Sequence, residues 1–230
     1  MEKMRVALTK DDEIKYVGHL DFGRAIERAL RRAKLPVAYS VGFNPHMKLS
    51  FGPALSVGVA SDAEYVDVEL TEPMNAADFG WALSAQLPPG LAFVAAHPVL
   101  TSASLAAALN LAAYRVTTVV LPTPDNLCAA RKALEAFQTA AVVEYCRRTP
   151  KGAKTMDVKK FLVGGISMIE EQQGIVLTFW LRMTATGAVK PTEVLSALTG
   201  QFGFPYGEAA FRRTALKAEQ NSKVQDPFEI

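Results

Sequence analysis

Two apolar periodicities alternate along this chain, and their order recurs. Short stretches typical of strands are separated by longer stretches whose apolar residues lie three and four apart, as in helices. In residues 1–100 the expected order is strand, helix, strand, strand, helix, strand, which is the ferredoxin-like βαββαβ unit. Residues 112–218 repeat this order. We therefore predict an α+β protein of two pseudo-duplicated ferredoxin-like units, with antiparallel sheets and helices on one face.

The first unit has clear boundary signals. We expect strands near residues 5–9, 49–59, 64–70 and 91–96, and helices at 21–34 and 75–87. Asp21 and Asn75 are the expected N-caps of the helices. The strand at 64–70 alternates, so its valines should face the core while Asp67 and Glu69 face solvent.

The second unit is expected to hold an additional segment. Its strands are predicted near 114–121, 141–147, 175–183 and 211–216, with helices at 124–140 and 191–198. The stretch 156–169 is expected to add an edge strand. Residues 101–111 are a linker or a short helix, and 219–230 are expected to form a flexible tail because they are polar and lack periodicity.

Charge is distributed unevenly along the chain. The net charge of +2 gives no argument for nucleic-acid binding, but residues 1–50 hold ten Lys and Arg against six acids. Residues 131–160 hold eight against three, while only one basic residue lies between 51 and 115. Two basic regions separated by an acidic one predict a polarised surface.

Several functional classes are disfavoured. Cys128 and Cys146 lie far apart with no neighbouring ligands, so we expect reduced thiols, no metal and no iron–sulfur site. The sequence holds neither a Walker phosphate loop nor a Gly-x-Gly-x-x-Gly turn, so we expect no cofactor. It shows no signal peptide and no apolar run of about 20 residues, so we expect a soluble cytoplasmic protein without a membrane partner.

A cationic amphipathic helix is expected at 21–34. The arginines on its polar face are Arg24, Arg28, Arg31 and Arg32. A row of guanidinium groups suits phosphates spaced along a strand, because each group can bind two oxygens at once. The alternative is a solvated helix face, partly neutralised by acids of the same helix.

A loop after this helix gathers polar groups. We expect Asn44 and His46 to contact a base or ribose, and Lys48 to bind phosphate. The proline after Asn44 keeps this segment extended or turned. For Phe43 and Phe51 we favour burial in the core over stacking on bases.

Histidines give the only candidates for catalysis. A pair of imidazoles beside RNA phosphates can act as acid and base, so His19 and His46 define an enzymatic alternative. Both histidines could equally be structural. We assign no catalytic residue beyond these two candidates, and we expect His97 to be structural.

The second basic region reads as a cationic hairpin tip. It comprises Arg147, Arg148, Lys151, Lys154, Lys159 and Lys160. The four lysines are candidates for phosphate contacts that track a backbone without reading bases. Asp157 is expected to be their ion-pair partner, and the alternative is a solvated loop.

The chain resembles a known family along most of its length. The motif at residues 18–59 reads GHLDFGRAIERALRRAKLPVAYSVGFNPHMKLSFGPALSVGV, and the second half adds KGAKTMDVKKF (151–161), GAVKPTEVLSAL (187–198) and RRTAL (212–216). These phrases are similar to the radical-SAM-associated proteins, an uncharacterised bacterial family found alone or fused to the C-terminus of a radical SAM protein. Gly18 and Met47 depart from the serine and proline that the resemblance leads us to expect.

The resemblance implies an RNA-linked role, since family members tend to be associated with RNA-processing and ribosomal genes. It also implies a radical SAM protein as partner, which would supply the cluster, because this chain lacks a Cys-x₃-Cys-x₂-Cys run. We therefore expect an RNA-binding accessory module. The alternatives are an RNA-acting enzyme using His19 and His46, and a module that docks the radical SAM protein without touching RNA.

Overall fold

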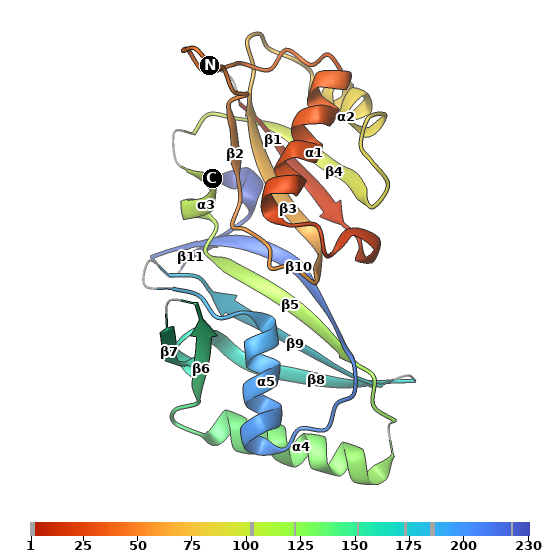
Figure 1. Cartoon of the computed structure of the whole chain (residues 1–230), viewed down its shortest axis with the longest axis vertical. Helices are drawn as coiled ribbons and strands as arrows, with labels where there is room; N and C mark the ends of the chain where they lie inside the picture. The colour runs from red at the N-terminus through yellow and green to blue at the C-terminus, as the bar shows by residue number, and fades with distance from the viewer. Residues whose placement is uncertain are drawn as a thin grey trace. The chain divides into compact units, whose positions relative to one another are not determined.

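The computed structural model describes residues 3–101, 104–121, 123–150, 152–172, 174–184, 187–221 and 223–230. The chain divides into two compact units (Figure 1), the first formed by Met1–Asn110 with Arg213–Ile230, and the second by Leu111–Arg212. Each unit contains both helices and antiparallel strands, so the predicted α+β class is confirmed.

The first unit has the predicted element order. Its elements are β1 (Lys3–Lys10), α1 (His19–Arg32), β2 (Leu49–Phe51), β3 (Val59–Glu69), α2 (Ala76–Ser84) and β4 (Leu91–Val99), with a 3₁₀ turn, η1, at Asp12–Ile14. The strand order is β4-β1-β3, and β2 pairs with β3. All of these pairs are antiparallel, which is the arrangement of a ferredoxin-like sheet.

One face of this sheet packs against α1 and α2. Alternate residues of the strands, such as Val6 and Val66, are fully buried there. They meet Ile26 of α1 and Phe79 of α2 in a single apolar cluster. The apolar stripe of each helix therefore fixes which of its faces points outward.

The other face of the first sheet is covered by the end of the chain. Residues 219–230 do not form the expected tail, because β10 (Ala209–Gln220) continues into β11 (Lys223–Gln225) and a last 3₁₀ turn, η3 (Pro227–Glu229). The Phe228 ring packs against Tyr65 and His97, with ring centroids 5.7 and 4.5 Å apart. A single aromatic anchor carries no periodicity, so the sequence pattern did not indicate it. The contact also gives His97 the structural role that was predicted.

A buried ion pair lies beneath this segment. Arg5 and Asp67 are each 1% exposed, and Nε and Nη2 of Arg5 donate to the two Asp67 carboxylate oxygens at 2.6 and 2.9 Å. Nη1 of Arg5 donates to the carbonyls of Pro227 and Ile230, the latter at 2.8 Å. The prediction that Asp67 faces solvent is therefore wrong, because the last residues of the chain cover that face of β3.

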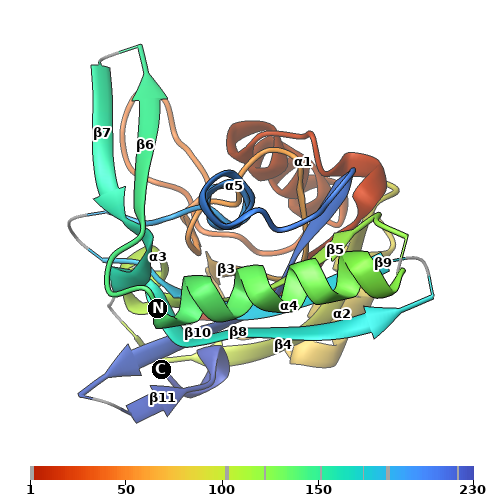
Figure 2. The ribbon, with the colours of Figure 1, turned by 90° about the horizontal axis from the view of Figure 1, so that it is seen from below.

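The second unit repeats the pattern with an inserted hairpin. Its elements are β5 (Leu111–Thr118), α4 (Pro124–Thr139), β6 (Glu144–Thr149), β7 (Gly152–Asp157), the 3₁₀ turn η2 (Val158–Lys160), β8 (Leu162–Glu171), β9 (Gly174–Arg182) and α5 (Pro191–Phe202). The strand order is β5-β9-β8, with β8 as the expected edge strand. The β6–β7 hairpin forms a separate two-stranded sheet that extends away from α4 and β8 (Figure 2).

Helix boundaries show which local signals were misread. Helix α1 begins two residues before Asp21, with Gly18 at the N-cap, and Asp21 lies in the first turn. Asn75 caps α2 as predicted, because its side chain accepts a hydrogen bond from the Ala77 amide at 2.7 Å. The segment after β4 forms a short helix, α3 (Leu105–Ala108). Across the described ranges, no helix is both long enough and apolar enough to span a membrane.

Removal of Asp67 tests the importance of the buried pair. We expect Asp67→Ala to lower the free energy of unfolding by about 3–5 kcal/mol, since it leaves the Arg5 charge buried without its counter-ion. Urea denaturation of the whole chain measures this change. The control is Glu170→Ala, which breaks an exposed pair with Arg131 and should cost at most about 1 kcal/mol. Equal losses in the two variants would contradict the central role of the buried pair.

Candidate nucleic-acid interface

The arginine face of α1 is the first part of the candidate interface. Burial of Phe22, Ile26 and Leu30 against the sheet turns the polar side of the helix to solvent. Consequently Arg24, Arg28, Arg31 and Arg32 are all exposed. The predicted separation of an apolar and a cationic face is therefore present.

The four arginines differ in their contacts. Arg24 donates to Asp21 at 3.0 Å, and both side chains are exposed, so this pair is weak. Arg32 donates to the Gln86 carbonyl at 2.5 Å. The guanidinium groups of Arg28 and Arg31 make no hydrogen bond or ion pair with any residue that the structure describes. These two guanidinium groups are the ones most available to an external anion.

The loop at residues 40–46 is closed at its base. The Ser40 amide donates to the His46 carbonyl at 2.9 Å, and the His46 amide donates to the Ser40 hydroxyl at 3.0 Å. A bridge between Tyr39 and Met47 extends this closure. The loop is thus held by backbone pairing although Met47 stands at the position where proline was expected.

The closed loop displays two large apolar side chains. Val41 is 103% exposed and Phe43 is 107% exposed, so the prediction that Phe43 lies in the core is wrong. Because its base is closed by backbone pairing, this short loop projects into solvent, and these two side chains do not pack on the sheet. Val41 was missed by the sequence reasoning, because an isolated valine beside a glycine gives no signal of exposure.

Phe51 has the core position that was predicted for it. Its ring packs edge-on against Phe22, with the centroids 6.1 Å apart. A Cβ added at Gly23 would lie 3.5 Å from this ring, which is an ordinary van der Waals contact, so the packing of Phe51 on α1 does not depend on glycine at this position. Phe51 therefore anchors β2 to the helix and is not available for base stacking.

The remaining loop candidates have different surroundings. Asn44 and His46 are exposed. Lys48 is half-buried, and its ammonium lies 3.2 Å from the Glu69 carboxylate. A phosphate at Lys48 would have to compete with that carboxylate, so Lys48 is a weaker candidate than Arg28 or Arg31.

His19 and His46 have no recorded contact in common. The His19 imidazole packs edge-on against Phe51 at 5.6 Å, and it lines a small cavity with Lys10 and Glu64. His46 lies on the exposed loop, paired through its backbone to Ser40. Among the described residues, nothing joins the two imidazoles at a shared substrate position.

A buried charge cluster lies beside His19 and was not predicted. Glu64 accepts a hydrogen bond from Arg213, and the Lys10 ammonium donates to the carbonyls of Lys15 and Val17 at 3.1 and 2.7 Å. Burial lowers the pKa of Lys10 below its usual value, and the nearby Glu64 charge offsets this lowering only in part. These contacts fix η1 and β3, and we assign them a structural role. Sequence spacing gave no signal for them, since the three charges lie far apart along the chain.

Part of the second basic region is structural. Arg147 donates from Nε and Nη2 to the Glu193 carboxylate, both at 2.6 Å, and from Nη2 to the Ala188 carbonyl at 2.8 Å. The hydrogen bond with Glu193 raises the pKa of Arg147, and burial partly opposes it. Glu193 is 5% exposed, so the pair ties the hairpin to α5.

Lys159 and Asp157 are also occupied. The Lys159 ammonium donates to the carbonyls of Phe137 and Gln138 at the end of α4, at 3.3 and 2.9 Å. Cations stabilise helix C-termini in this way. Asp157 caps η2 by accepting from the Lys159 amide at 3.1 Å, so it acts on the backbone and not as the expected ion-pair partner of the lysines.

Three further lysines belong to the second basic region, and the structure describes two of them. Lys154 and Lys160 are exposed, on β7 and at the end of η2. Lys151 lies outside the described residues. In the ranges that the structure describes, no group of three His, Cys, Asp or Glu side chains is placed to hold a metal ion.

The fold and this surface define the chain as an α+β protein of two ferredoxin-like units with a cationic helix and loop on the first. A protein-family profile described as "Uncharacterized protein conserved in bacteria (DUF2344)" matches residues 3–191. The chain belongs to this family.

Comparisons with other known proteins add little. No curated protein matches the chain. A solved structure titled "Crystal Structure of a Cbf5-Nop10-Gar1 Complex" contains a chain with 12% sequence identity and a TM-score of 0.46. The similarity covers 93% of this chain and 48% of that one, so this chain spans about half the length of its structural neighbour.

Comparison of Arg147 with its neighbour Arg148 separates a structural role from the effect of removing one positive charge. We expect Arg147→Ala to lower the free energy of unfolding by about 1–3 kcal/mol, because the buried Glu193 carboxylate loses its charged partner and keeps only the Lys190 amide. The side chain of Arg148, the next residue, is exposed and makes no hydrogen bond or ion pair with a described residue. Arg148→Ala should therefore change the free energy of unfolding by less than about 0.5 kcal/mol. Thermal and urea unfolding measure both. A larger loss for Arg148→Ala would reverse this assignment.

Proposed function

We propose that this chain is a cytoplasmic RNA-binding accessory module that works with a radical SAM partner. The observation that carries the proposal is the pair of exposed arginines, Arg28 and Arg31, without recorded partners in the described chain, on the helix that leads into the loop displaying Phe43. Cationic groups and an exposed aromatic ring are the two features that single-stranded RNA binding requires.

The geometry of the helix supports phosphate binding at α1. Residues three apart lie on the same side, so Arg28 and Arg31 present neighbouring guanidinium groups. Each can donate two parallel hydrogen bonds to a phosphate. Arg24 adds a third charge once its weak, exposed pair with Asp21 is exchanged for a phosphate.

Base contacts are assigned to the loop. Phe43 offers a solvent-exposed ring, and stacking on it is tolerant of base identity. Asn44 and His46 are exposed beside it and supply amide and imidazole groups for hydrogen bonds. Lys154 and Lys160, which are exposed on the second unit, are candidates for phosphate contacts made by that unit.

The partner comes from the family resemblance. The motifs at residues 18–59, 151–161 and 187–198 are similar to those of radical-SAM-associated proteins. The chain has no three-cysteine run of its own, so the proposal places the radical chemistry on the partner and RNA presentation on this chain.

A docking module without RNA contact is the second candidate. The exposure of both Val41 and Phe43 favours it, because exposed apolar side chains are also typical of protein-binding surfaces. The enzymatic alternative gains no such support, since no contact brings His19 and His46 together within the described residues.

Charge reversal on α1 tests RNA binding. We expect Arg28→Glu with Arg31→Glu to abolish measurable binding to fluorescent single-stranded and hairpin RNA pools at 150 mM salt. Where residual binding is measurable at low salt, the slope of log K against log salt should be smaller by about 1.4, since about 0.7 is lost for each of two phosphate contacts. Fluorescence anisotropy over a range of salt concentrations gives both values.

The matched control reverses two exposed basic residues of α4, Arg131→Glu with Lys132→Glu, which changes the net charge equally. Equal loss of binding in the control would show a general charge effect and contradict an interface on α1. Crosslinking of the tagged chain in cells then separates the candidates. Recovery of a radical SAM protein with no RNA would favour the docking module.

Phe43→Ala tests stacking separately from charge. We expect RNA affinity to fall by about 5- to 100-fold, the range for loss of one stacked base, with the salt slope unchanged. Trp81→Ala, which removes an aromatic side chain that is 80% exposed on α2, is the control and should leave affinity unchanged. Unchanged affinity in Phe43→Ala would remove the loop from the RNA site.

A further inference from the structure

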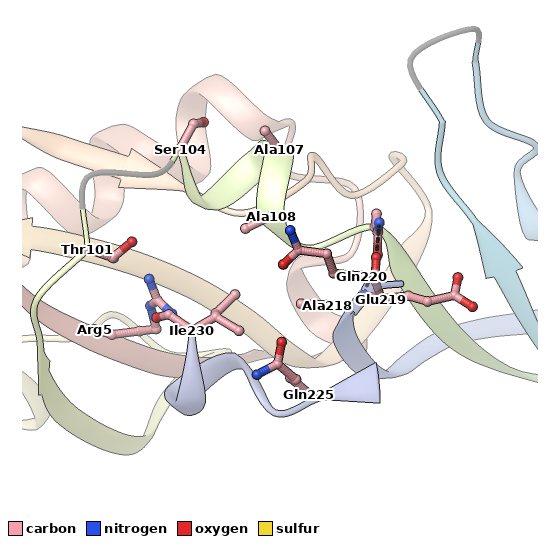
Figure 3. A pocket seen from close by; sticks show the side chains of 11 residues that line it. Arg5, Thr101, Ser104, Ala107, Ala108, Ala218, Glu219, Gln220, Gln225 and Ile230 are labelled. Atoms are coloured by element: carbon pink, nitrogen blue, oxygen red, sulfur yellow. Dashed lines mark hydrogen bonds between the residues drawn. The ribbon is translucent and has the colours of Figure 1, made fainter. Parts of the chain in front are cut away.

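A cavity of about 540 Å³ lies in the first unit, on the sheet face opposite α1 (Figure 3). Arg5 of β1 lines it, and the other walls come from α3 with its flanking residues, the end of β10, β11 and Ile230. This volume is within the range of small-molecule sites. None of the residues considered for the RNA interface lies in it.

The cavity has no surplus positive charge. The Arg5 guanidinium is neutralised by the two carboxylate oxygens of Asp67, at 2.6 and 2.9 Å. Nη1 of Arg5 is occupied by the carbonyls of Pro227 and Ile230. Glu219, at the rim, adds a negative charge. The cavity therefore has no surplus cation for a phosphate, and it favours a neutral ligand.

One wall is fixed by a reciprocal amide contact. Nδ2 of Asn110 donates to the Glu219 carbonyl at 2.9 Å, and Oδ1 of Asn110 accepts from the Glu219 amide at 2.7 Å. Both hydrogen-bonding ends of this carboxamide are thus used. Asn110 holds β10 in place and does not contribute to ligand recognition.

Two other carboxamides remain available. Gln225 pairs with Ala218 across the β10–β11 hairpin, and Gln220 lies two residues beyond Ala218, so both glutamines lie on the same face. Figure 3 shows both carboxamides beside the space under α3. No hydrogen bond is recorded for either side chain with any residue the structure describes.

The remaining lining suits a flat ring. Ala107, Ala108 and Ala218 contribute only methyl groups, and Ile230 contributes an aliphatic side chain. Small apolar faces with carboxamides at one side match a planar heterocycle that carries donors and acceptors on its edge. Carboxamides pair with base edges through two hydrogen bonds at once.

We propose that this cavity binds a single unpaired nucleobase of the RNA that α1 and the loop hold by its backbone, with Gln220 and Gln225 recognising its edge. This inference rests on the proposed RNA binding. Enzymes and binding modules that act on a base take it out of the stack into such a pocket.

The cavity is physically connected to the loop through β2. Lys48 leads directly from the loop into β2, and the Ser50 hydroxyl contacts the amide of Leu105, the first residue of α3, at 3.4 Å. The helix that roofs the cavity is thus attached to the strand that follows the RNA loop.

The test is titration of the ¹⁵N-labelled whole chain with adenosine, guanosine, cytidine and uridine, followed by NMR of the glutamine side-chain amides. We expect at least one nucleoside to shift the Gln220 and Gln225 signals, while inorganic phosphate does not. Gln225→Leu should lower the affinity for this nucleoside by about 5- to 100-fold, the range for loss of a bidentate carboxamide–base pair. Gln172→Leu, at an exposed glutamine of the second unit, is the control.

A second variant fills the cavity. Ala107 is exposed, so Ala107→Phe should preserve the fold, confirmed by an unchanged unfolding midpoint, and should prevent nucleoside binding. Retained binding in this variant, or shifts caused by phosphate alone, would overturn the inference.

The outcomes separate this inference from RNA binding itself. Charge reversal at Arg28 and Arg31 should abolish RNA binding and leave nucleoside shifts intact. RNA binding without any nucleoside shift would overturn the cavity assignment and leave the proposed function standing. Nucleoside shifts in a chain that binds no RNA would overturn both the proposed function and the assignment of an RNA base to the cavity.

Discussion

The first unit depends on one buried ion pair. Removing Arg5 and Asp67 from water is costly, and their mutual attraction offsets that cost only because further hydrogen bonds satisfy the guanidinium. Those bonds go to the carbonyls of Pro227 and Ile230, so the pair fixes the end of the chain on the sheet. The same contacts place Phe228 on Tyr65 and form the floor of the cavity. This charge pair therefore helps to hold the last residues of the chain on the second face of the sheet.

Arginines of this chain have different roles because of their neighbours. Arg147 and Arg5 lie within reach of buried carboxylates, and those acids fix them as parts of the fold. Arg28 and Arg31 lie on a helix whose opposite side is needed for the core, and Asp21 of the same helix pairs with Arg24. The guanidinium groups that the fold does not use are thus the ones that remain for a ligand. This distinction, and not the density of basic residues, is the basis for the proposed interface.

Periodicity predicted the elements but not what covers them. The alternation along β3 and the stripe of α1 were sufficient to place Val66 and Ile26 in the core. The same alternation placed Asp67 in solvent, and it failed because the residues that bury Asp67 come from the end of the chain, more than 150 positions away. The helix N-caps were predicted only in part. Asn75 was predicted correctly, but Asp21 was not, because the N-cap of α1 is Gly18, which forms no side-chain cap. The exposure of Phe43 could not be predicted from the sequence, because hydrophobicity alone does not distinguish a core residue from one displayed on a closed loop.

The proposed interface and the cavity differ in the physics of recognition. Phosphate contacts at Arg28 and Arg31 gain their free energy largely from counter-ion release, so they are sensitive to salt and indifferent to sequence. A cavity that has no surplus positive charge and is lined by Gln220 and Gln225 has the opposite properties, since neutral hydrogen bonds to a base edge depend on the base and little on ionic strength. An accessory module that presents RNA to a partner needs both kinds of contact: one to hold any strand and one to fix its register. The loop and the cavity are joined within the first unit through the contact between β2 and α3.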